Sequence, residues 1–200
     1  MQRLKGFSDA AWEVVQKKPM AHCIDVASGN RQMYPESVKD SPLCIFCDEE
    51  PRLKVKPDLV SDWKVLHTHF PPDYFHCAIW DPPHIFSLTN QFNKTPWFTS
   101  NGSKNQPGWY GGFDGKRDAV REIFHGQESI SKIAPRLCFK WNEAQMPVEW
   151  AISLLKNFRV QFLTRYVSPV RVNSQVKAKT WWVKLVRRTV DDKDVIKAKK

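Results

Sequence analysis

Six short stretches of mostly apolar residues recur along the chain, and polar segments separate them. The first four are almost continuously apolar, which is typical of strands buried on both faces of a parallel sheet. The last two are richer in β-branched and aromatic residues, which also favour strands. The pattern therefore predicts strands at 20–26, 42–47, 74–80, 137–141, 160–167 and 180–186.

Helical patterns lie among these strands. Ser8 precedes a short apolar-periodic run and is a suitable helix cap. Apolar residues recur at helical spacing in 117–125, and the segment 147–158 begins with a proline and gathers its apolar residues on one side. This alternation predicts an α/β, Rossmann-like fold with a mainly parallel central sheet flanked by helices. We divide the chain into an N-terminal helix (1–18), a Rossmann-like domain (19–188) and a flexible basic tail (189–200).

Polar residues follow the first four predicted strands. The first strand ends in Asp25 and a turn containing Gly29, the second in Asp48, the third in Asp81, and the fourth in Asn142-Glu143. An Asp at such a place is a common turn former or helix cap, so the ordered series means more than any single residue. Ligands of open α/β sheets bind beyond the carboxyl ends of the strands.

The first two strand ends together indicate a nucleoside-binding edge. A glycine turn lets a ligand approach the backbone, and an acid after the next strand can hold two ribose hydroxyls. The sequence contains neither G-x-G-x-x-G nor G-K-[ST], so no phosphate-binding loop is expected.

The third strand end, IWDPPHIF, is the most specific. It resembles the D-P-P-[YFW] motif of S-adenosylmethionine-dependent methyltransferases that act on exocyclic amino groups of nucleobases. IDVASGN is similar to the first motif of that class, CIFCDEE to its acidic second motif, and LCFKWNEAQ and TWWVKLV to the later strands of its small, phage-type members. The resemblance covers roughly 21–186.

The resemblance implies a class I methyltransferase fold, S-adenosylmethionine as cofactor, and adenine in DNA as the favoured substrate. An aromatic amine is a poor nucleophile, because its lone pair is delocalised into the ring. A carboxylate and a backbone carbonyl that accept its two N–H groups favour the transition state. His84 stands where the family has Tyr, Phe or Trp, and Ala27 where it often has Gly. The implied catalytic residues are Asp81, Pro82, Pro83 and His84, and the implied cofactor-binding residues are Asp25, Ala27, Ser28, Gly29, Asp48 and Asp81.

The stretch 87–115 is rich in Asn, Ser, Gly, Pro and aromatic residues and has no regular period. A loop of that length is usually functional or disordered. Its mixture of rings and cations suits a wall over a base flipped out of a duplex, while packing of the rings onto the sheet is the structural alternative. The residues expected to bind substrate are Lys94, Lys104, Trp109 and Tyr110.

Composition and charge indicate the cellular location and the partners to expect. The net charge is +10, and nine Lys or Arg accompany three Asp in 176–200, which suits either a solvated tail or a contact with nucleic acid. The chain has no apolar run long enough to span a membrane, no signal-peptide pattern and five cysteines. We therefore expect a cytoplasmic protein with reduced thiols, whose partner is DNA or RNA rather than a membrane. A bacterial host, a phage origin, and a homodimer or partner subunit are left open.

Several alternatives remain at this point. Cys44 and Cys47, with His67, His69 and nearby residues, are of zinc-ligand type, but free cysteines in an apolar strand usually pack as small hydrophobes, so we expect no metal. The chain could also be a methyltransferase-like subunit that binds nucleic acid without catalysis, or could methylate RNA or a protein amide. Lys140 and Glu143 lie near the same sheet edge, and an ion pair or helix cap is the favoured interpretation for them.

Overall fold

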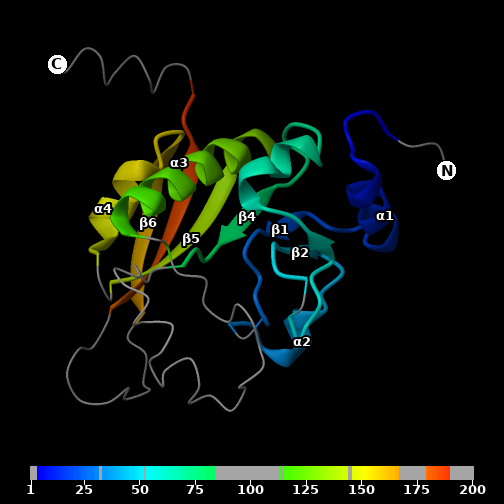
Figure 1. Cartoon of the computed structure of the whole chain (residues 1–200), viewed down its shortest axis with the longest axis horizontal. Helices are drawn as coiled ribbons and strands as arrows, with labels where there is room; N and C mark the ends of the chain where they lie inside the picture. The colour runs from blue at the N-terminus through cyan, green and yellow to red at the C-terminus, as the bar shows by residue number, and fades with distance from the viewer. Residues whose placement is uncertain are drawn as a thin grey trace.

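The computed structural model describes residues 4–31, 33–51, 53–83, 113, 115–143, 146–166 and 179–189. In these ranges the chain forms a single sheet with helices around it (Figure 1). The elements are α1 (Asp9–Lys17), β1 (Cys23–Asp25), α2 (Glu36–Lys39), β2 (Cys44–Asp48), β3 (Leu59–Val60), the 3₁₀ helix η1 (Trp63–Thr68), β4 (Cys77–Trp80), α3 (Gly115–Ile133), β5 (Arg136–Asn142), α4 (Val148–Leu154), β6 (Phe158–Tyr166) and β7 (Thr180–Arg187).

The sheet has seven strands in the order β3-β2-β1-β4-β5-β7-β6. All pairings from β3 to β5 are parallel, whereas β7 runs antiparallel to both β5 and β6. The sheet is therefore mixed, and the expectation of a mainly parallel sheet holds only for its first five strands. The strand order reverses between β1 and β4, which is where α/β sheets of this kind bind ligands.

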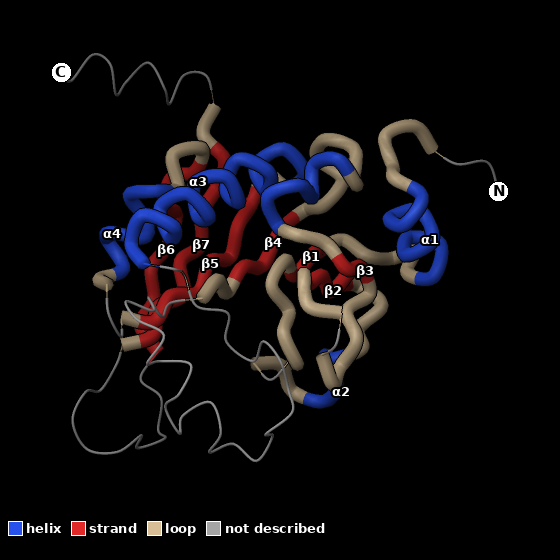
Figure 2. The backbone as a smooth tube through the Cα atoms, viewed as in Figure 1, coloured by secondary structure: helices blue, strands red, loops and turns tan. Residues whose placement is uncertain are grey.

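Helices α3 and α4 lie on the same face of the sheet (Figures 1 and 2). Their side of the sheet carries the largest core residues, including the fully buried Trp80, Phe139 and Trp141. α1 lies beside β3 at the other end of the molecule, capped by the Ser8 hydroxyl, which accepts the Ala11 N–H.

Helix α3 approaches β4 very closely at Gly126. A Cβ atom built on this glycine would lie 2.7 Å from ring atoms of Trp80 and 2.9 Å from the Trp63 ring. Both rings belong to the core, so they have little freedom to move aside. Gly126 therefore allows α3 to lie directly over the strand that leads to Asp81.

The sequence predicted most of these elements but not their exact ends. Every predicted strand is present, and the helix predicted at 117–125 is part of the longer α3. The short elements α2, β3 and η1 were not predicted, because each has too few residues to show a period. No helix within the described ranges is both long and apolar enough to cross a membrane.

Candidate active site

Asp25, the last residue of β1, is completely buried at the carboxyl end of the strand. The Tyr34 hydroxyl donates a 2.8 Å hydrogen bond to Asp25 Oδ2, and the Ala27 N–H donates a 3.1 Å bond to Oδ1. Burial raises the pKa of Asp25 to about 7, although both hydrogen bonds act to lower it. The negative charges of Asp81 and Asp48 add to the increase.

Asp48, the last residue of β2, is tied to the turn that follows β1. The Gly29 N–H donates to Asp48 Oδ2 at 2.8 Å, and the Glu50 N–H donates to Oδ1 at 3.0 Å. Gly29 has a φ of +49°, and a Cβ atom placed on it would meet nothing within 4 Å. The turn therefore presents open backbone beside a carboxylate, as a nucleoside-binding edge requires.

Asp81 directly follows β4 and forms an ion pair with Lys140 of β5. Register explains the contact: Trp80 pairs with Phe139, so the next residue of each strand lies side by side. Lys140 Nζ donates to Asp81 Oδ2 and lies 5.9 Å from the centre of the Trp182 ring. Within the described residues, Asp81 Oδ1 has no hydrogen bond. The side chains of Asp81 and Lys140 are 22% and 24% exposed, so this pair is reachable from solvent.

Glu143, just beyond β5, has the structural role that its position suggested. Its Oε1 accepts the N–H of Val148, the first residue of α4, and its backbone N–H donates to the Lys179 carbonyl. These bonds join the end of β5 to the starts of α4 and β7.

Two buried polar atoms at this edge lack hydrogen-bond partners among the described residues. Ser28 Oγ lies in the turn between Asp25 and Gly29, and Asn142 Oδ1 lies at the end of β5. The Asn142 amide nitrogen donates to Thr180 Oγ1 at 3.0 Å, which leaves its carbonyl oxygen unused. Buried polar groups are normally hydrogen-bonded, so these two atoms are groups that a polar ligand at this edge could satisfy.

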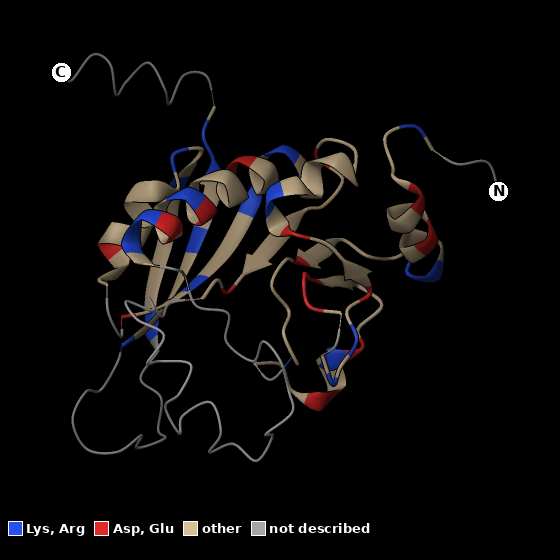
Figure 3. Ribbon diagram, in the orientation of Figure 1, with Lys and Arg blue, Asp and Glu red and all other residues tan. Residues whose placement is uncertain are grey.

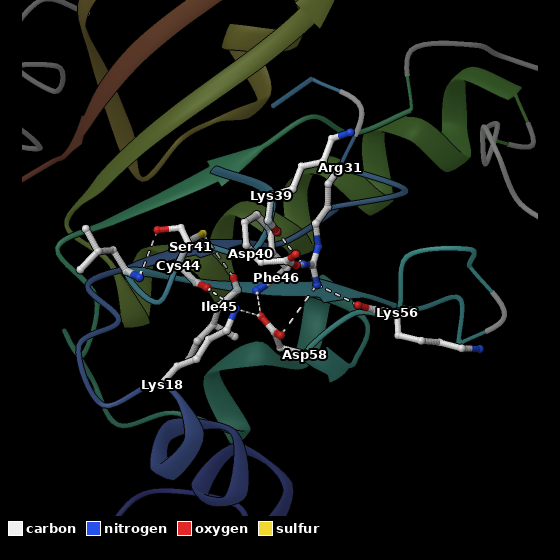
Figure 4. Close-up of polar contacts among 11 residues, drawn as sticks. Lys18, Arg31, Lys39, Asp40, Ser41, Cys44, Ile45, Phe46, Lys56 and Asp58 are labelled. Carbon is white, nitrogen blue, oxygen red and sulfur yellow. Dashed lines mark hydrogen bonds and ion pairs between the residues drawn. The ribbon is translucent and has the colours of Figure 1, made fainter. Parts of the chain in front are cut away.

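A cluster of charged residues in the loops that follow β1 and β2 was not predicted from the sequence (Figure 4). The buried Arg31, with φ +55°, donates to Asp40 Oδ1 and to the carbonyls of Lys39 and Lys56, and its guanidinium stacks 4.1 Å from the centre of the Phe46 ring.

The centre of this cluster is Asp58. It lies 3.7 Å from Arg31 Nη2, and its Oδ2 accepts a 2.6 Å bond from Lys18 Nζ and a 2.9 Å bond from the Phe46 N–H. The cluster thus holds together the loops that follow β1 and β2. No pattern in the sequence marks Arg31, because its partners lie far from it along the chain.

Several predicted residues lie outside the described ranges, namely His84, Lys94, Lys104, Trp109 and Tyr110. The described residues contain no group of three or more His, Cys, Asp or Glu that could hold a metal ion. Cys44 and Cys47 are buried in β2, and burial raises the pKa of each thiol.

A cavity of about 550 Å³ lies at the opposite edge of the sheet, where β4, β5 and β6 begin. It contains none of the three acids. Arg187 at this cavity is already paired with Asp73, so we do not assign the cavity to the candidate site. Its lining residues include His67, Phe70, Asp73, Lys132, Asn157 and Arg187.

Comparisons with known proteins do not identify the chain. No family model matches it, and no curated protein matches it. Among solved structures it is similar to protein 1320 of Thermoplasma acidophilum, with a TM-score of 0.41 and 10% identity, covering 88% of this chain and 85% of that one. A likeness at this level carries no information about function, so the site must be judged on its own geometry.

Proposed function

We propose that the protein is an S-adenosylmethionine-dependent methyltransferase with a Rossmann-like class I fold, acting on an exocyclic amino group of a nucleobase, with adenine in DNA as the favoured substrate. One observation carries the proposal: Asp48, Asp25 and Asp81 lie at the carboxyl ends of the adjacent strands β2, β1 and β4, on either side of the point where strand order reverses.

The residues at this edge fit the cofactor. Asp48 can accept ribose hydroxyls while Gly29 keeps the approach to the backbone open. The Ser28 hydroxyl is a buried hydrogen-bonding group without a described partner. When bound, S-adenosylmethionine supplies an activated methyl group on a sulfonium, so the protein's part is mainly orientation.

Asp81 is proposed to accept one N–H of the target amine, and the carbonyl of Pro82 the other. Asp81 Oδ2 accepts a hydrogen bond from Lys140 Nζ, so the side chain is held at the end of β4. Oδ1 has no partner among the described residues and is the atom proposed to accept the N–H of the amine. The two prolines leave no N–H donor to compete at this turn.

The Lys140 contact also favours a second candidate, a methyltransferase-like subunit that binds nucleic acid without catalysis. In that case the ammonium would occupy Asp81 permanently. Methyl transfer to RNA or to a protein amide would use the same Asp81 geometry. Transfer assays with DNA, RNA and protein substrates distinguish these possibilities.

Titration calorimetry with S-adenosylmethionine and its demethylated product tests the cofactor edge. We expect saturable binding that Asp48→Ala weakens and that Asp40→Ala, at a 91% exposed side chain, leaves unchanged. Asp81→Asn should retain cofactor binding and lose transfer of labelled methyl to DNA. Binding of nucleic acid without any cofactor binding would favour the non-catalytic subunit instead.

A further inference from the structure

One face of β5, β7 and β6 has no described helix over it. Helices α3 and α4 cover the other face, where Phe139, Trp141 and Val183 are fully buried. Side chains alternate between the two faces of a strand, so the register defines which residues point away from these helices. We call these residues the open face: Arg136, Cys138 and Lys140 of β5, Trp182, Lys184 and Val186 of β7, and Arg159, Phe162 and Thr164 of β6.

The open face is positively charged. It carries four Lys or Arg and no acid, and Arg136, Lys184 and Arg159 are all exposed. Figure 3 shows blue segments on these strands, whereas α3 carries both colours. Lys140 is paired with Asp81, whereas Arg136 and Lys184 form no salt bridge with a described residue.

Aromatic rings lie between these cations. Phe162 is 54% exposed and pairs across the strands with Lys184. Trp182 lies one row nearer the site, beside the Lys140 ammonium. Phe162 is exposed and Trp182 is partly buried. Aromatic rings on a pleated sheet between cations are an arrangement with which several folds stack unpaired bases and hold the nucleic-acid backbone.

The dimensions favour a single strand. From Lys140 to Arg136 the chain rises roughly 13 Å, and three neighbouring strands span roughly 10 Å. That area suits two or three nucleotides with their bases flat on the sheet. The row that contains Lys140 lies next to Asp81, so the surface leads to the candidate site.

We propose that the open face binds single-stranded nucleic acid and guides it toward Asp81; the second half of this statement rests on the proposed function. A protein partner is the competing occupant, because β6 is an edge strand to which another chain could pair. The excess of cations over acids on this face, with Arg136 and Lys184 lacking a salt bridge to any described residue, favours the polyanion.

Fluorescence anisotropy tests the proposal with labelled 12-nucleotide DNA and RNA strands over a range of KCl concentrations, without cofactor. The double variant Arg136→Gln/Lys184→Gln should bind roughly tenfold more weakly at 0.1 M salt, with the slope of log K against log salt reduced by about 1.4. The control Lys17→Gln/Lys132→Gln removes the same charge from exposed positions on α1 and α3 and should retain the wild-type slope.

Phe162→Ala gives an independent readout. Loss of stacking should weaken binding about fivefold or more and leave the salt slope unchanged, since no phosphate contact is removed. Equal effects of the open-face and control pairs would overturn the proposal. So would a Phe162→Ala variant that binds normally but changes the molar mass in light scattering, which would identify a protein interface. Because no cofactor is present, these results stand whether or not Asp81 supports methyl transfer.

Discussion

The charge of Asp25 offers a direct test of the candidate site. Burial raises its pKa to about 7 in the folded protein, against about 3.9 in an unfolded chain. A carboxyl whose folded pKa is raised stabilises the fold at pH values below its unfolded pKa and loses that contribution as pH rises through about 7. A difference of about three pH units corresponds to ~4 kcal/mol of unfolding free energy between pH 4 and pH 8.

Asp25→Asn removes the charge and retains the shape. The amide oxygen can still accept the Ala27 N–H, and the amide nitrogen can donate to the Tyr34 hydroxyl, which is free to turn. We therefore expect the variant to be more stable than wild type by as much as ~4 kcal/mol at pH 8, with the two nearly equal at pH 4.

Urea unfolding followed by tryptophan fluorescence across pH 4–8 provides the measurement. Asp40→Asn is the control, since its side chain is 91% exposed and its substitution should leave the pH dependence unchanged. A constant difference between wild type and Asp25→Asn over the whole range would refute the reasoning, because it would show that the folded and unfolded states bind the same number of protons at Asp25.

Three further predictions concern the scaffold. The Sγ atoms of Cys23 and Cys77 lie 2.9 Å apart on neighbouring strands, and a hydrogen bond from the Cys77 thiol lowers the pKa of Cys23 to about 7. Oxidised glutathione at pH 8 should therefore join the two cysteines in a disulfide. Mass spectrometry should then count three free thiols in place of five. Gly126→Ala should lower the unfolding free energy by about 2 kcal/mol despite the better helix propensity of alanine, because its methyl group would meet two buried tryptophan rings; unchanged urea unfolding would contradict the close packing. Arg31→Ala should cost about 3 kcal/mol, since it removes a buried guanidinium that joins two loops and packs on Phe46, whereas Asp40→Ala, at a 91% exposed side chain, should cost less than about 0.5 kcal/mol. Similar losses in the two variants would argue against the cluster.

The sequence predicted the acids of the site because their position depends on local pattern. Asp25, Asp48 and Asp81 each follow a short apolar strand, and parallel strands bring their carboxyl ends to one edge. The contacts of these acids could not be predicted in the same way. Tyr34 reaches Asp25 through the loop after β1, and Lys140 meets Asp81 only because of the register between β4 and β5.

The difference between local pattern and tertiary contact also explains why β3 and the antiparallel strand pairing were not predicted. β3 has only two residues and is a strand because it pairs with β2. Two residues are too few to show a strand pattern in the sequence. The last two strands were predicted correctly as strands, but apolar pattern does not encode direction. Their antiparallel pairing makes the sheet mixed.

The ionic cluster around Arg31 and Asp58 has a consequence for motion at the site. It fastens the loop after β1 and the segment before β3 to the same side chains. Asp58 also donates its backbone N–H to the Phe46 carbonyl of β2 and accepts the Phe46 N–H on Oδ2. Neither loop can open without breaking the bonds of the other. Amide hydrogens in 31–40 and 54–58 should therefore exchange with deuterium as one cooperative unit, at a common opening free energy, and the turn that contains Gly29 should share it.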